Sequence, residues 1–129
     1  MVEEVYAMKI YEFTKESGKT ITRFNSSGVT IHPLLKPDSP FQIGYFYLEA
    51  KSVLGMHLAM CDQVLMITSG NGWVRVKDGE KRPVKAGMAV YWSEGEEHES
   101  GTETGMTAIV AEGSDLDPKR FLSSLQPGD

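Results

Sequence analysis

The sequence has 129 residues, of which 40% are hydrophobic and 24% charged, and its formal net charge is −5. This length and composition predict one globular domain with a core of its own. The acidic balance excludes a nucleic-acid surface and docking on anionic lipid, because both need clustered Lys and Arg.

Cys61 is the single cysteine of the sequence, so no internal disulfide and no oxidising compartment are predicted. Residues 1–10 carry two acids and no long apolar run, which is unlike a signal peptide. No stretch approaches the roughly 20 apolar residues that a membrane helix needs. The expected location is therefore the cytoplasm, with no membrane partner.

Short apolar segments separated by turn residues recur along the chain, at 9–14, 20–25, 29–31, 41–50, 56–60, 63–68, 73–77, 88–93, 98–103 and 106–110. Two hairpin turns are predicted, at Gly70-Asn71-Gly72 and at Asp78-Gly79, since Gly, Asn and Asp tolerate a positive φ. Many short strands with frequent turns indicate a β-sandwich or β-barrel.

The C-terminal segment is the one part of the sequence with a helical pattern. Asp117 offers an N-cap and Pro118 suits the first helical turn. Phe121, Leu122 and Leu125 then share one face at helical spacing. A short helix is therefore predicted over 117–125.

Two segments carry the chemistry that singles out this sequence. Residues 55–70 resemble the first motif of the cupin superfamily, in which His-x-His and then Glu precede an apolar strand that ends in Gly. Residues 87–98 resemble the second motif, in which Gly, Pro-x-Gly and His follow at fixed spacing. Here the spacing is kept, with Ser93 at the proline position and His98 at the histidine. Thr102 stands where the second motif often has Asn.

The resemblance implies roles for particular positions of this chain. His57 and His98 fall on the first and last metal-ligand histidines of the family, and Gln63 falls on its glutamate ligand. Ala59 falls on the middle histidine, and alanine has no ligand atom. The implied set of three His and one Glu is thus reduced to two His and one amide.

Two interpretations of this reduced set remain open. Imidazoles suit zinc, nickel or iron, and manganese is a further candidate, but an uncharged amide attracts a cation less than a carboxylate does. Alternatively the site holds no metal, and His57, Gln63 and His98 hydrogen-bond an organic ligand. Cys61 would share their face only if the strand ran straight, and it is interpreted as a small buried apolar group rather than a ligand.

Neighbouring residues add smaller expectations. Leu65 and Ile67 share the parity of Gln63 and are predicted to line the pocket. The acidic residues around His98 form a solvated loop whose negative field would favour the protonated imidazole. His32, just before Pro33, is expected to be structural or exposed.

The sequence therefore predicts an all-β fold, namely a single cupin-like jelly-roll barrel. Its parts are N-terminal strands in 1–28, the barrel core in 29–111 and the helix in 117–125. The first functional hypothesis is a small-molecule-binding protein whose pocket centres on His57 and His98, with a weakened or absent metal site. The second is a metal-dependent oxygenase or isomerase that uses His57, Gln63 and His98. Enzyme activity is left open between them, and a homodimer is expected because the N-terminal strands present an edge that needs cover.

Overall fold

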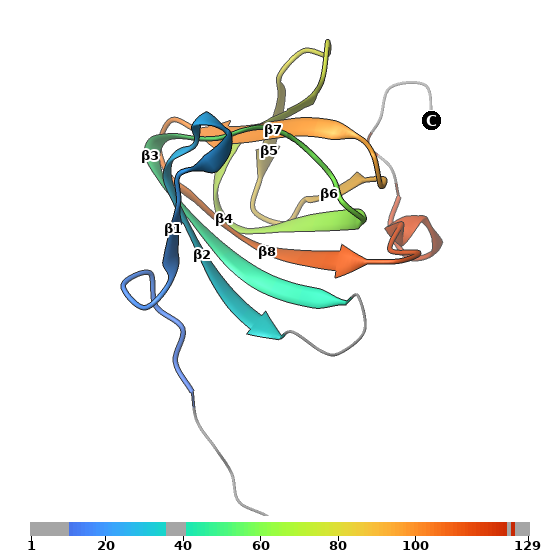
Figure 1. Cartoon of the computed structure of the whole chain (residues 1–129). Helices are drawn as coiled ribbons and strands as arrows, with labels where there is room; N and C mark the ends of the chain where they lie inside the picture. The colour runs from blue at the N-terminus through green and yellow to red at the C-terminus, as the bar shows by residue number, and fades with distance from the viewer. Residues whose placement is uncertain (1–10, 36–40, 124, 126–129) are drawn as a thin grey trace, which may run out of the picture.

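The computed structural model describes residues 11–35, 41–123 and 125, and these form one antiparallel sheet of eight strands that curls into a barrel (Figure 1). In chain order the strands and two short 3-10 helices are β1 (Lys19–Ile21), η1 (Arg23–Asn25), β2 (Ser27–Leu35), β3 (Gln42–Leu58), β4 (Asp62–Val76), β5 (Arg82–Lys85), β6 (Ala89–Trp92), β7 (Glu97–Thr102), β8 (Met106–Gly113) and η2 (Pro118–Arg120). The predicted all-β barrel is confirmed.

The barrel closes because its two longest strands each take part in two layers. The first half of β3 pairs with β2 and β8, and its second half pairs with β7. The first half of β4 pairs with β8 and β6, and its second half pairs with β7 and β5. A strand shared by two layers removes a free edge and fixes the curvature.

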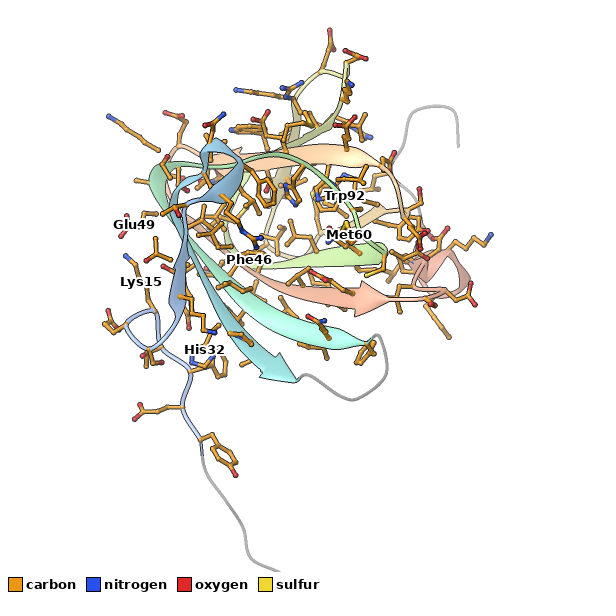
Figure 2. The ribbon with its side chains drawn as sticks, viewed as in Figure 1. Lys15, His32, Phe46, Glu49, Met60 and Trp92 are labelled. Atoms are coloured by element: carbon orange, nitrogen blue, oxygen red, sulfur yellow. The ribbon has the colours of Figure 1, made fainter. Side chains whose placement is uncertain are left out.

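The core consists of the side chains that alternate inward along these strands. It is built mainly from branched aliphatic residues, together with Met106, Ala108 and one indole, and its members include Val29, Leu48, Leu65, Ile67, Val110 and Trp92. Trp92 lies within the ring of strands (Figure 2). Leu65 and Ile67 are 5% and 4% exposed and pack in this core, and their predicted place in the pocket lining stays a prediction.

The Gly70-Asn71-Gly72 segment is not the predicted hairpin turn but part of β4. A Cβ on Gly70 would lie 2.2 Å from the carbonyl oxygen of Gly105, and a Cβ on Gly72 would lie 2.2 Å from that of Gly101. The glycines therefore let β4 pass close to the neighbouring backbone where it moves from one layer to the other. The second predicted turn is confirmed, since the Gly79 amide donates to the Val76 carbonyl at 2.9 Å.

The two ends of the described chain also differ from the predictions. Of the strand expected over 9–14, residues 9 and 10 lie outside the described residues, and 11–14 are not strand. The segment 20–25 is split between β1 and η1, because Phe24 and Asn25 both take a positive φ. β1 pairs with β2 of the same chain.

The predicted helix over 117–125 is reduced to the three residues of η2. Its start is as expected, with the Asp117 carboxylate accepting from the Lys119 amide at 3.0 Å. The residues meant to anchor it, Phe121, Leu122 and Leu125, are 84%, 52% and 73% exposed. A short helix without an apolar face to bury is only marginally stable, so the turn does not continue. No helix among the described residues meets the length and hydropathy of a membrane span.

Candidate functional site

His57 and His98 lie side by side on adjacent strands. They are direct partners in the antiparallel register of β3 and β7, so their side chains leave the same face of the sheet. Their ring centroids are 4.4 Å apart. The structure thus brings together two histidines that are distant in sequence.

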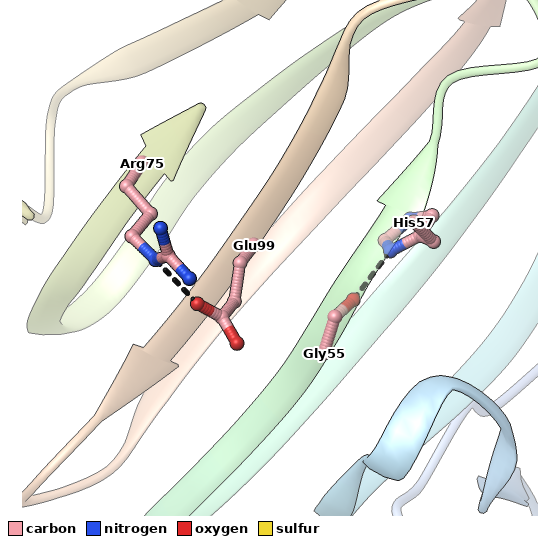
Figure 3. A network of polar contacts seen from close by, with 4 residues as sticks. All are labelled: Gly55, His57, Arg75 and Glu99. Carbon is pink, nitrogen blue, oxygen red and sulfur yellow. Dashed lines mark hydrogen bonds and ion pairs between the residues drawn. The ribbon is translucent and has the colours of Figure 1, made fainter. Parts of the chain in front are cut away.

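Both imidazoles are held by the same local hydrogen bond. Nδ1 of His57 lies 2.7 Å from the carbonyl oxygen of Gly55 (Figure 3), and Nδ1 of His98 lies 3.1 Å from that of Glu96. A carbonyl oxygen only accepts, so Nδ1 carries the hydrogen in each ring. In the neutral ring Nε2 then keeps its lone pair. No protein partner for either Nε2 is found within the described residues.

Burial decides the charge of His98. The residue is 2% exposed, and its ring stacks on Trp92 at 4.0 Å between centroids. Burial, with a smaller contribution from neighbouring His57, lowers the pKa of His98 from 6.5 to about 4. The expectation that nearby acids would favour protonated His98 is therefore wrong, and at neutral pH this imidazole is uncharged.

The acids around His98 are tied to other groups, which explains their small effect. Glu99 forms an ion pair with Arg75, whose Nε lies 2.6 Å from its Oε1 (Figure 3), and Glu97 pairs with Lys77 at 3.3 Å. Glu96 turns its carboxylate to accept from the Ser93 amide at 3.1 Å. These carboxylates therefore tie β7 and the turn before it to neighbouring groups rather than charge the histidine, so the predicted solvated loop is in part a strand.

Gln63 faces the same interior from β4. Its register partner on β6 is Trp92, so its side chain leaves the sheet on the side of the indole that packs on His98. Gln63 is 9% exposed, and no hydrogen bond of its side-chain amide is found within the described residues. An amide without a protein partner is a group that a ligand or water can satisfy.

Ala59, just after β3, binds through its backbone to the loop that carries the second motif. It is fully buried, and its amide donates to the Glu96 carbonyl at 3.0 Å while its carbonyl accepts from Gly95 at 2.8 Å. Thr102, at the position where the family motif often has Asn, donates to the Asn71 carbonyl at 2.6 Å and accepts from the Gly105 amide at 2.9 Å. Both residues thus hold the strands that present the histidines.

Phe24 covers His57 from the side of η1. The two rings stack with centroids 4.8 Å apart, and Phe24 takes a positive φ of 61°. A Cβ at Gly55 would lie 1.6 Å from the Phe24 carbonyl oxygen, so only glycine lets this turn reach the strand. The sequence pattern predicted no role for Phe24 or Gly55.

Glu112 is the site residue that the sequence analysis missed. It lies on β8, directly opposite Gln63 on β4 and Gln42 on β3. Burial raises the pKa of Glu112, and the charge of His57 partly offsets that effect. The signal was parity, because Glu112 is half-buried and has the same period-two spacing as the buried Met106, Ala108 and Val110, two residues beyond the predicted end at 110.

The structure also places Cys61 and His32, the two remaining residues that the sequence singled out. Cys61 is partly buried, and burial, reinforced by the charges of Glu112 and Asp62, raises the pKa of its thiol. A protonated thiol is a poor metal ligand. His32 lies near Pro33, as expected, with Nε2 at 3.1 Å from Ser17 Oγ and Nδ1 at 3.0 Å from the Pro33 carbonyl.

The residues fit a metal ion only in part. The Nε2 atoms of His57 and His98 are suitable ligands, and their Nδ1–carbonyl hydrogen bonds are typical of metal-binding histidines. However, no three His, Cys, Asp or Glu side chains within 11–35, 41–123 and 125 are placed to hold a metal. The metal hypothesis thus rests on two imidazoles and the Gln63 amide.

The sequence matches no family model and no curated protein significantly. Among solved structures, a cupin-like protein from Thermotoga maritima is 20% identical with a TM-score of 0.69, over 78% of each chain. An RmlC-like cupin from Methanocaldococcus jannaschii is 19% identical with a TM-score of 0.64, over 84% of this chain and 92% of that one. The polyketide cyclase RemF from Streptomyces resistomycificus is 15% identical with a TM-score of 0.64, over 80% and 77%. Together with the barrel topology, these similarities show that the chain has the cupin fold.

Proposed function

We propose that this protein binds a small molecule inside the barrel, at the site formed by His57, Gln63 and His98. The observation that carries the proposal is the pair of imidazoles, each fixed through Nδ1 and each keeping Nε2 without a protein partner in the described residues. An acceptor without a protein partner can take a hydrogen bond from a donor outside the chain. A ligand that donates hydrogen bonds could bind to both Nε2 atoms.

The surroundings support binding in a defined orientation. Phe24 stacks on His57 and Trp92 stacks on His98. These contacts hold the two Nε2 atoms in a fixed relative position. The unpaired amide of Gln63 supplies both a donor and acceptors. Apolar walls with a few oriented polar groups are the usual composition of small-molecule sites.

A metal-dependent enzyme is the second candidate, and the Nδ1–carbonyl hydrogen bonds of the two histidines favour it. A metal held there would supply Lewis-acid chemistry. The chain's own residues would orient the two imidazoles and exclude water with Trp92. Because the cupin fold hosts a cyclase as well as proteins named only for their fold, the fold does not choose between the candidates.

We expect ligand binding to depend on His57 and His98 and not on the third histidine, His32. A fragment library is screened by amide chemical-shift changes in ¹⁵N-labelled protein with chelator present. Hits should perturb the amides of His57, Gln63 and His98 and should be lost in His57→Gln and His98→Gln. His32→Gln is the matched control, since His32 lies on the outer face beside Ser17, and it should keep every hit.

The same fragment screen distinguishes the small-molecule-binding protein from the metal-dependent enzyme. Organic hits in the presence of chelator support the binding protein. If fragments bind only after zinc or nickel is added, the result supports the metal-dependent enzyme instead of the binding protein. If no fragment perturbs these residues under either condition, the proposed function is wrong.

A further inference from the structure

Glu112 has a position that the proposed function does not yet use. Its side chain shares the inner face with Gln63 on one neighbouring strand and with Gln42 on the other. No hydrogen bond or ion pair of its carboxylate is found within the described residues. Burial raises its pKa, and among the described residues the charged group that acts on this carboxylate is His57, which lowers that pKa.

A small pocket adjoins this carboxylate. Its volume is about 130 Å³, and its polar lining consists of Glu112 and Gln42. The rest of the wall is apolar and comes mainly from Ile31, Pro33, Ile43 and Val110. A space of this size suits a short apolar chain of a few non-hydrogen atoms.

The polar groups of the histidine site and Glu112 mostly accept hydrogen bonds. The Nε2 lone pairs of His57 and His98 accept, and the Glu112 carboxylate accepts and carries negative charge. Gln63, nine-tenths buried and without a side-chain partner in the described residues, contributes a carbonyl oxygen as well as its NH₂. Among the described residues that line the pocket there is no Lys or Arg.

We infer that the site is selective for a small organic ammonium ion, with Glu112 binding its charged group and the adjoining pocket taking its apolar part. An ammonium group donates three hydrogen bonds and suits a set of acceptors with one carboxylate. An anion of the same size would be repelled by the charge of the Glu112 carboxylate. This inference rests on the proposed function and names the class of ligand.

The inference is tested with three probes of one shape, namely n-butylammonium, n-butanol and butyrate, at neutral pH, low salt and with chelator. They are titrated into ¹⁵N-labelled protein while the amides of Gln42, Gln63 and Glu112 are followed. We expect butylammonium to bind about tenfold or more tightly than butanol, and butyrate not to bind, because a hydrogen bond to a charged partner is the stronger one.

Glu112→Gln keeps the shape of the side chain and removes its charge. In this variant butylammonium should bind no better than butanol. Glu103→Gln is the matched control, because it removes the same charge from an exposed residue, and it should leave the preference intact. Thermal melts check that both variants fold.

Each of the following results would contradict the inference. If butanol or butyrate binds as well as butylammonium, or if Glu112→Gln keeps the preference, ammonium selectivity by Glu112 is wrong while the pocket stands. If none of the three binds but library fragments bind at the histidines, the ligand belongs to another class. If the library also gives no hits, the proposed function fails with it.

Discussion

Replacing Trp92 with alanine is expected to lower the free energy of unfolding by about 3–5 kcal/mol, the range for removing a large buried aromatic side chain. Trp92 is 4% exposed, belongs to the core and stacks on His98 with an angle of 17° between the ring planes. Its loss would leave a cavity beside the imidazole, since β6 holds it opposite Gln63 on a paired strand. Urea denaturation followed by circular dichroism measures the change.

Two variants make this result specific to the position. Trp92→Phe keeps an aromatic ring against His98 and should lose less than Trp92→Ala. Trp73→Phe changes the other tryptophan, which is half-buried beneath Lys81, and should cost less than Trp92→Ala. A loss below about 1 kcal/mol for Trp92→Ala would mean that the indole is not part of the packed core.

Acidification is expected to destabilise the protein through His98. The pKa of His98 is about 4 in the folded state and near 6.5 when the chain unfolds, so the unfolded state binds more protons between these values. Stability contributed by the neutral buried ring is therefore present above pH 6.5 and is lost progressively as the pH falls toward 4. Between pH 7 and pH 4.5 the expected loss is about 2–3 kcal/mol.

Other groups titrate in the same range, so the measurement is a difference between two proteins. Burial raises the pKa of Glu112, which has the opposite sign and adds stability as the pH falls. His98→Gln removes only the histidine contribution. The unfolding free energy of the native protein should fall more steeply with acidification than that of His98→Gln, and parallel curves would contradict a buried neutral His98.

The sequence alone predicts the barrel and the histidine pair because both depend on fixed spacing. The turn residues and short apolar strands indicate the fold class. The two motifs place His57 and His98 at positions that cupin topology brings together, and the structure does so at 4.4 Å. A pattern that holds across two separated segments constrains contacts between strands that local propensity does not describe.

The parts that were mispredicted depend on contacts that one strand's sequence does not contain. Glycines at 70 and 72 have the same local preference in a turn as at a close strand crossing, and only the carbonyls of Gly105 and Gly101 decide between them. The charge of His98 depends on the depth at which Trp92 covers it, not on the acids beside it in sequence. Glu112 comes from outside both motifs and joins the site through the register of β8 with β4.

The central claim is that the two histidines present Nε2 lone pairs to a ligand site inside the barrel. Long-range ¹H–¹⁵N correlation spectra of the imidazole rings test it most directly, because protonated and unprotonated ring nitrogens have well separated shifts. We predict that His98 shows a protonated Nδ1 and an unprotonated Nε2 from pH 7 down to pH 5, and that the Nε2 signals of His57 and His98 move when a fragment binds. A protonated Nε2 on His98 at pH 6, or Nε2 signals that stay in place when a fragment binds, would contradict the claim.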